Sequence, residues 1–352
     1  EEKGFNEVDS LALSQFAYLK FDGLAPEIGE SKPMVSLQEL FEHQDYDRLY
    51  ADERYREDNT ALFLGFVHSK RFHEMKVGNY VNQIDLETET QFSAVTFRLP
   101  NGVYYVAYRG TDETIVGWKE DLNLAFSEPV RGQLMSVDYL NRAADAMTGD
   151  FYVGGHSKGG NLATYACMNC DEEVRSRIMA IYDHDGPGFR PEVRKQGAWQ
   201  EIEGRIHKTV PRSSLVGMLL YTEGDYRVVE SKTIGLAQHN PYTWLEKEDD
   251  FRLADEIRPG RRFVDQTLNE WILSLDQAQM HIFVDTLYRA VQASETDNLI
   301  DFSAHWITCV QKIGKAIGEV DEETADVVTQ IMRAFFETVS LHAKELAHSE
   351  RK

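Results

Sequence analysis

Apolar residues recur along the chain at two spacings, which distinguish predicted strands from predicted helices. Two β-branched and aromatic runs, at 91–99 and 103–109, flank Pro100-Asn101-Gly102, and this arrangement predicts a β-hairpin. Beyond it, two kinds of pattern alternate: helices at 133–147 and 160–169, and strands at 151–153, 178–182, 205–210 and 226–229. Such alternation predicts a mostly parallel sheet flanked by helices, which is an α/β fold.

Helical patterns are also predicted at both ends of the chain. Asp9 is a residue type that caps helices, and apolar residues at helical spacing follow it within 11–19. Near the other end, apolar residues recur three and four positions apart in four segments, at 263–275, 277–293, 299–317 and 322–347. We therefore predict an α/β domain with an N-terminal helical extension at 1–245 and a helical region at 246–352. The helical region could form a cap over a site or the contact surface of a homo-oligomer.

The most informative motif is Gly155-x-Ser157-x-Gly159, which lies between a predicted strand and a predicted helix. In an α/β-hydrolase this motif forms a sharp strand-to-helix turn that exposes the serine, and its glycines tolerate the strained backbone. The start of the following helix would also place NH groups near Ser157, where negative charge develops on an acyl intermediate. The motif therefore predicts that Ser157 is a nucleophile and that the fold is an α/β-hydrolase.

A serine nucleophile needs a base within hydrogen-bond reach and a carboxylate that orients the base. In this fold class the chain order is serine, acid, histidine. That order selects His239, which lies in a loop after the last predicted strand, from the eleven histidines. Three carboxylates remain open as the acid. Asp183 and Asp185 follow the predicted strand 178–182 at the C-terminal edge of the sheet, and Asp225 lies at the start of a later strand.

An acyl intermediate also needs NH donors for its oxyanion. One is predicted to be the backbone NH of Lys158, directly after the nucleophile. The other is expected from the loop after an early strand, where Gly110 and Thr111 follow 103–109. Thr111 could contribute both its NH and its hydroxyl.

Composition narrows the classes of partner. A formal net charge of −22 repels polyanions, so no nucleic-acid partner is predicted. One group of basic residues is expected to form a solvated face: Arg190, Arg194, Lys195, Arg205, Lys208 and Arg212. Three cysteines give no disulfide framework, and no run approaches the ~18 apolar residues of a membrane span. We expect a cytoplasmic protein, or a secreted one if an export signal has been removed.

Three stretches resemble the class 3 (fungal-type) lipases over residues 92–244: VAYRGTDET, then Trp118 with Asp121-Leu122, then VGGHSKGGNLA. The resemblance implies Ser157 as nucleophile, Thr111 as an oxyanion residue and His239 as base. Where those lipases are expected to carry their aspartate, after VP-type residues, this chain has Ser214, which cannot serve as the acid.

A second resemblance spans residues 5–245 and rests on FNEVDSLALSQFAYLKFDG, DGPGF, SSLVGMLL and QHNPYTW. These sequences are similar to a family of bacterial lipase-like proteins of unknown function, in which the DGPGF aspartate recurs. That recurrence favours Asp185, whereas the spacing Asp183-x-x-x-Pro187-x-Phe189 resembles pancreatic-type lipases and favours Asp183. The resulting order is Asp185 first, Asp183 second and Asp225 third.

Together these patterns predict a serine esterase or lipase-like hydrolase that cleaves carboxylic esters through an acyl-enzyme, with Ser157, His239 and Asp185 as its triad. The expected partner is a small-molecule or lipid ester, and no metal or organic cofactor is predicted. A thioesterase or peptidase would use the same machinery, and a non-catalytic binding protein could retain the fold. These alternatives stay open.

Overall fold

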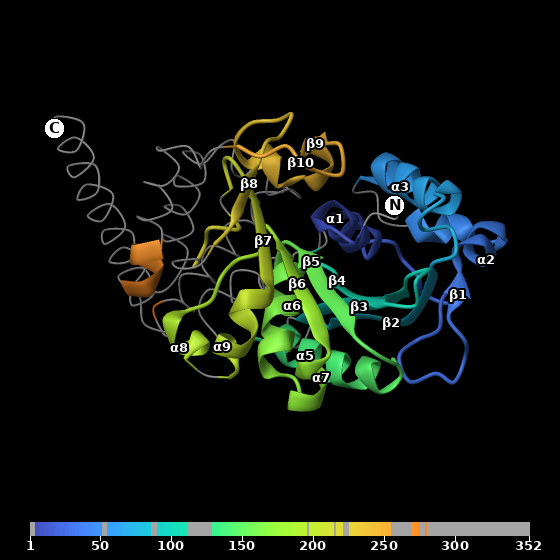
Figure 1. The fold of residues 1–352 in the computed structure, drawn as a ribbon, viewed down its shortest axis with the longest axis horizontal. Coiled ribbons are helices and arrows are strands. Elements are labelled where there is room, and N and C mark those ends of the chain that lie inside the picture. The colour runs from blue at the N-terminus through green and yellow to red at the C-terminus, as the bar shows by residue number, and fades with distance from the viewer. Residues whose placement is uncertain are drawn as a thin grey trace, which may run out of the picture.

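The computed structural model describes residues 4–50, 55–85, 90–111, 129–195, 197–214, 216–220, 225–254, 269–274 and 279. Its centre is an 8-stranded sheet whose strands lie side by side in chain order (Figure 1). They are β1 (Val35–Ser36), β2 (Lys76–Asp85), β3 (Thr90–Arg98), β4 (Tyr104–Tyr108), β5 (Phe151–His156), β6 (Ile178–His184), β7 (Ile206–Pro211) and β8 (Arg227–Val229). The pairs from β1 to β4 are antiparallel and those from β4 to β8 are parallel. The predicted hairpin and the predicted parallel region are confirmed.

Helices cover the two faces of the sheet in different ways. Crossovers between parallel neighbours are right-handed as a rule, so a strand order that never reverses places the connecting helices on one face. These helices are α5 (Arg131–Asp145), α6 (Lys158–Asn169), α7 (Glu172–Ser176), α8 (Pro191–Arg194) and α9 (Trp199–Ile202). The other face is covered by the N-terminal segment, with α1 (Glu7–Phe16), α2 (Leu37–Glu42) and α3 (Arg56–His68) (Figure 1). The N-terminal extension is therefore part of the main core.

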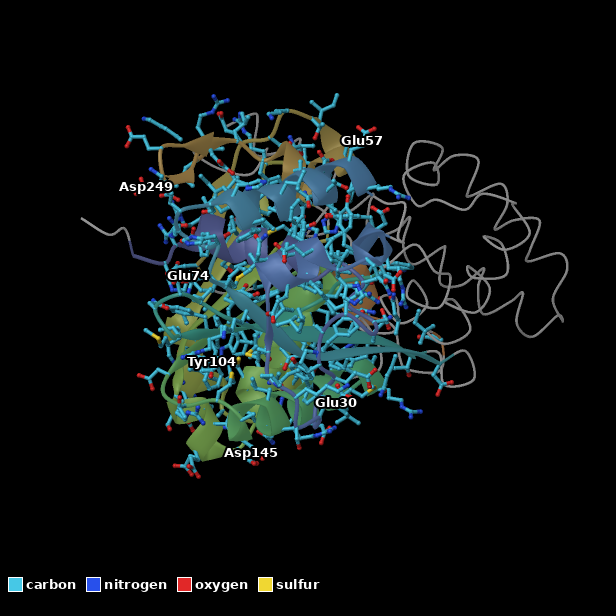
Figure 2. All side chains as sticks on the ribbon, turned by 90° about the vertical axis from the view of Figure 1, so that its right-hand side faces the viewer. Glu30, Glu57, Glu74, Tyr104, Asp145 and Asp249 are labelled. Atoms are coloured by element: carbon cyan, nitrogen blue, oxygen red, sulfur yellow. The ribbon has the colours of Figure 1, made fainter. Side chains whose placement is uncertain are left out.

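The remaining elements are short. Among the described residues they are the 3-10 helices η1 (Tyr46–Tyr50), η2 (Glu203–Arg205), η3 (Gly235–His239) and η4 (Pro241–Thr243), and the hairpin of β9 (Glu246–Lys247) and β10 (Asp250–Phe251). Carboxylates lie on the outside of several of the larger elements and loops, as Figure 2 shows for Glu30, Glu57, Glu74, Asp145 and Asp249. The acidic side chains labelled there thus belong to separate parts of the surface.

Each face of the sheet carries an apolar core. Under α1 and α3 the fully buried residues include Leu13, Phe16, Phe63 and Phe97, and under α5 and α6 they include Leu140, Leu162, Val153 and Ile181. Cys167 and Cys170 lie in the second core as free thiols, and burial raises the pKa of both. No helix in the described part of the chain is long and apolar enough to cross a membrane.

The start of the first helix differs from the prediction. Asn6, and not Asp9, is the N-cap: its side chain accepts a hydrogen bond from the Asp9 NH at 2.9 Å. The Asp9 carboxylate in turn accepts from the Asn6 NH at 3.1 Å. This reciprocal capping box satisfies two backbone donors at once, which explains why the helix begins earlier than a single cap at Asp9 would allow.

Several predicted features lie outside the described residues. They are Trp118, Asp121 and Leu122, and most of the predicted helical region at 246–352. Of the four helical segments predicted there, only 269–274 and 279 are described, and both are helical. The cap or homo-oligomer surface therefore stays a prediction.

A buried polar cluster joins α1 to the sheet. Ser10 Oγ lies 2.7 Å from Tyr105 Oη and 2.9 Å from His184 Nε2, and Ser14 Oγ lies 2.9 Å from Tyr105 Oη. His184 is completely buried, and this burial lowers its pKa to about 3. An imidazole kept neutral in this way can exchange hydrogen bonds with the serine hydroxyl without introducing a charge beneath the helix.

The free energy of unfolding should depend on pH through His184. The folded protein holds this histidine neutral down to about pH 3, whereas an unfolded chain protonates it near pH 6.5. The unfolded state therefore binds the extra proton between these values, and stability falls as the pH is lowered through the window, by up to about 1.4 kcal/mol per pH unit. Urea unfolding from pH 6.5 to 4.5 should show a steeper loss for the wild type than for His184→Gln.

The exposed His73→Gln variant is the matched control, since it removes an imidazole that the fold leaves in solvent. Identical slopes for the wild type and His184→Gln would contradict the assignment of a buried neutral imidazole.

Candidate active site

Ser157 occupies a strained turn between β5 and α6. Its backbone has φ 59 and ψ −133, a conformation that residues with a side chain rarely adopt. The turn is possible because its glycines pack without side chains. A Cβ on Gly155 would overlap the backbone of Gly159, and a Cβ on Gly159 would overlap the carbonyl oxygen of Tyr108. Backbone packing therefore requires glycine at both positions of the motif. Ser157 itself is half-buried at the turn.

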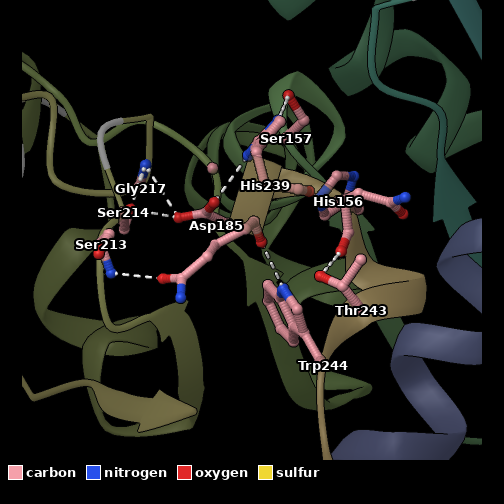
Figure 3. A network of polar contacts seen from close by, with 12 residues as sticks. His156, Ser157, Asp185, Ser213, Ser214, Gly217, His239, Thr243 and Trp244 are labelled. Carbon is pink, nitrogen blue, oxygen red and sulfur yellow. Dashed lines mark hydrogen bonds and ion pairs between the residues drawn. The ribbon is translucent and has the colours of Figure 1, made fainter. Parts of the chain in front are cut away.

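The structure brings the three highest-ranked site residues together (Figure 3). Ser157 Oγ lies 3.0 Å from His239 Nε2, and His239 Nδ1 lies 2.7 Å from Asp185 Oδ2. Because a carboxylate only accepts, Nδ1 is assigned as the protonated nitrogen, which leaves Nε2 to accept from the serine hydroxyl. The Asp185 side chain is fully buried, whereas that of His239 is 21% exposed.

Both oxygens of the Asp185 carboxylate are engaged. Oδ2 contacts His239, and Oδ1 accepts hydrogen bonds from the Ser214 hydroxyl and, at 3.1 Å, from the Gly217 NH. Asp185 has a φ of 53, just past the end of β6, and its NH donates to the Thr209 carbonyl at 2.8 Å. The carboxylate is thus held in one orientation by the loop after β7, and this part of the site was not predicted from the sequence.

Ser214 stands where an acid was expected after VP-type residues, and it contacts the acid candidate instead of replacing it. The sequence contained a signal for this arrangement. Ser214 has a hydroxyl at the expected acid position, and two carboxylates, Asp183 and Asp185, follow the preceding predicted strand. This combination indicates that the serine could reach one of the carboxylates. The strand order, with β6 and β7 adjacent and parallel, supplies the geometry that the sequence alone left open.

Asp183, the second candidate, has a different set of partners. It lies opposite Lys208 in the register of β6 and β7, and Lys208 Nζ donates to Asp183 Oδ2 at 2.7 Å. Asp183 Oδ1 accepts from the Gly186 NH at 2.8 Å. Burial raises the pKa of Asp183, while the Lys208 ammonium and the Gly186 NH act in the opposite direction. This buried ion pair lies beneath the loop that carries Asp185.

The structure also places two other charged residues that the sequence analysis named. The predicted solvated face is wrong for Lys208, whose side chain is 0% exposed and paired with Asp183. Asp225, the third acid candidate, lies on the exposed stretch before β8. His239 contacts Ser157 and Asp185, the first-ranked acid candidate.

The loop that carries His239 is anchored by its neighbours (Figure 3). Gln238 is buried, and it accepts from the Ser213 NH at 2.8 Å and donates to the Thr233 carbonyl at 2.7 Å. The Trp244 indole donates to the Gln238 carbonyl at 2.8 Å. These contacts, which spacing along the sequence could not reveal, restrict the position of the histidine backbone.

His156, next to the serine, also holds the His239 backbone. Its Nε2 lies 3.0 Å from the His239 carbonyl oxygen and must donate, since a carbonyl only accepts. The two imidazole rings lie 4.7 Å apart, centroid to centroid. The segment His156-Ser157 therefore contacts His239 twice: His156 binds its backbone carbonyl, and Ser157 contacts its imidazole.

Of the predicted oxyanion residues, Lys158 directly follows the serine, and Thr111 follows a glycine that approaches it. Lys158 is the first residue of α6, and Thr111 is buried next to Gly110. A Cβ on Gly110 would lie 3.2 Å from Ser157 Cβ, so the turn after β4 reaches the nucleophile candidate. The Lys158 ammonium donates to the Gln91 carbonyl at 3.0 Å and is buried. Its backbone NH, at the start of the helix, is thus the part of Lys158 suited to an anion.

These features define the class of protein. The sheet has a parallel region and helices on both faces, and Ser157 sits on a strained strand-to-helix turn. Together these features define an α/β-hydrolase fold of the lipase-like kind. The chain belongs to the Mbeg1-like family, whose model matches residues 66–289. No curated protein matches the chain.

Solved structures that resemble the chain include lipases. The propeptide complex of Rhizomucor miehei lipase is 17% identical with a TM-score of 0.35, and the match covers 53% of this chain and 62% of that one, less than two thirds of its length. M37 lipase is 14% identical with a TM-score of 0.39, covering 61% and 70%. A fungal lipase–inhibitor complex is 14% identical with a TM-score of 0.40, covering 77% and 89%.

The buried ion pair should matter for stability. Replacing Asp183 with Asn would leave the Lys208 ammonium buried without its anion, so Asp183→Asn should lower the free energy of unfolding by about 3–5 kcal/mol in urea. The double variant Asp183→Asn with Lys208→Met removes both charges and should be more stable than the single variant. A single variant as stable as the wild type would contradict this role.

Proposed function

We propose that the chain is a serine hydrolase that cleaves carboxylic esters through an acyl-enzyme. The observation that carries the proposal is the uninterrupted pair of contacts from Ser157 Oγ to His239 Nε2 and from His239 Nδ1 to Asp185 Oδ2, at 3.0 and 2.7 Å. This is the spacing that nucleophile activation by a general base requires. The lipase-like fold and the family membership support the same class of chemistry.

In the proposed reaction, His239 Nε2 takes the proton of Ser157 as Oγ attacks the ester carbonyl. The carbonyl oxygen becomes an anion beside the NH groups of Lys158 and Thr111. His239 then returns the proton to the departing alcohol, which leaves an acyl group on Ser157. Water attacks this acyl-enzyme by the same route, and the carboxylic acid is released with Ser157 restored. Asp185 stays ionised and holds the imidazolium in place.

Two observations favour an enzyme over a binding protein that kept the fold. Ser157 retains a strained backbone, which costs about 1–3 kcal/mol and persists only where surrounding packing maintains it. Furthermore, the His239 side chain is 21% exposed and Ser157 is half-buried, so the described residues leave the pair partly open. A protein that only bound ligand would need neither the strain nor the aligned imidazole.

A fluorophosphonate probe tests the proposal, because it phosphonylates only an activated serine. We expect one adduct on Ser157 by peptide mass spectrometry and hydrolysis of p-nitrophenyl esters of short to long acyl chain. Ser157→Ala and His239→Ala should each lower kcat about 10⁶-fold, and Asp185→Asn about 10⁴-fold. Asp183→Asn should lower kcat less than Asp185→Asn. Folded wild-type protein that neither reacts with the probe nor turns over any ester would overturn the proposal.

Ser214 provides a finer test, since it contacts only the acid among the three proposed catalytic residues. Ser214→Ala removes one hydrogen bond to a carboxylate, a loss of about 1.5–3 kcal/mol, and should lower kcat about 10-fold or more with little change in KM. Ser213→Ala is the matched control, because the contact to Gln238 comes from the Ser213 backbone NH and survives the substitution. Equal activity of the two variants would show that the Ser214 hydroxyl does not position Asp185.

A further inference from the structure

The turn after α1 presents a phenol to the candidate active site. α1 ends at Phe16, and the Tyr18 NH donates to the Gln15 carbonyl at 3.0 Å, which closes the turn. Ala17 and Leu19 are each 1% exposed and belong to the core under α1. Tyr18 lies between them and is only half-buried. Its side chain is therefore directed away from that core.

The hydroxyl of Tyr18 reaches the turn after β4, which contains Gly110 and Thr111. A Cβ placed on Gly110 would overlap Tyr18 Oη. This Cβ would also lie 2.7 Å from the His156 carbonyl oxygen and 3.2 Å from Ser157 Cβ. The space beside Gly110 is thus bordered by the phenol oxygen of Tyr18 and by the side chain of Ser157. The ring of Tyr18 also lies 6.5 Å from the ring of His156.

The helix that precedes Tyr18, α1, is fixed to the strands that carry the rest of the site. Ser10 and Ser14 bond to Tyr105 on β4, and Ser10 bonds to His184 at the end of β6. β4 leads into the Gly110 turn, and the His184 carbonyl accepts from the Ser157 NH at 2.9 Å. The phenol is therefore attached to the same frame as the serine and the turn, which favours a fixed position over a mobile one.

We propose that the Tyr18 hydroxyl is a third hydrogen-bond donor to the oxyanion, beside the backbone NH groups of Lys158 and Thr111. The proposal rests on the serine hydrolase function proposed above. A phenol is uncharged at neutral pH and can donate its O–H without giving up the proton. Donors fixed where negative charge develops stabilise the transition state more than the bound ester, so the effect falls mainly on kcat.

The test is the removal of one oxygen atom by Tyr18→Phe. With p-nitrophenyl esters we expect kcat to fall about 10- to 100-fold, since a side-chain donor shares the oxyanion with two backbone NH groups, while KM changes little. A trifluoromethyl ketone adds to the serine and generates an oxyanion in the complex. Its Ki should rise by the same factor as kcat/KM falls, a parallel that a purely structural role would not produce.

Tyr50→Phe is the matched control, because it removes a buried phenol hydroxyl from the same N-terminal extension, in the core under α1. Its kinetics should equal those of the wild type, and urea unfolding should show that Tyr18→Phe remains folded. An unchanged kcat, a change confined to KM, or a fall in kcat without weaker ketone binding would each overturn the proposal.

The wild-type measurements separate this proposal from the function on which it rests. A wild type that hydrolyses esters, paired with a Tyr18→Phe variant of equal activity, would overturn only the role of Tyr18. A wild type without turnover and without a probe adduct would overturn the proposed function and the role of Tyr18 together.

Discussion

The burial of the Asp185 carboxylate is the constraint around which the rest of the site is arranged. A buried anion must have its oxygen atoms hydrogen-bonded, and here one oxygen contacts His239 while the other accepts from Ser214 and Gly217. Those partners come from the loops after β7 and β8, so the carboxylate joins three consecutive loop regions at one edge of the sheet. The Asp183–Lys208 pair supports the same loop from beneath. The position of the imidazole follows from these contacts.

The strand order explains why the N-terminal extension is integral to the protein. Because the strands follow one another in chain order, the crossover helices all lie on one face, and the other face would expose apolar side chains. α1 covers that face, and its serines engage polar groups of the strands beneath it. A segment that protects the core therefore also lies next to the serine turn. α1 packs on β5, the strand that leads into the Ser157 turn, so the covered face and the candidate site meet at that strand.

Local patterns in the sequence were sufficient for the hairpin, the strands from β5 to β8 and the serine turn, since each depends on neighbours a few residues away. The ranking of the acid candidates rested on family resemblance, and the structure places the first of them, Asp185, against His239. Other features depend on contacts between distant residues. Ser214 and Asp185 are 29 positions apart and Lys208 and Asp183 are 25 apart. The register of parallel strands brings these pairs together, and periodicity does not encode register.

Under the proposed function, the contact between Ser214 and Asp185 limits how the acid of the triad can change place within such a family. Two aspartates at these positions would put two negative charges within hydrogen-bond distance, where both cannot stay ionised. An ancestor that moved its carboxylate from one strand end to the other would pass through a site with a shared proton, or one with no acid at all. Positions 185 and 214 should therefore covary, with an aspartate at one accompanied by a small hydrogen-bonding residue at the other.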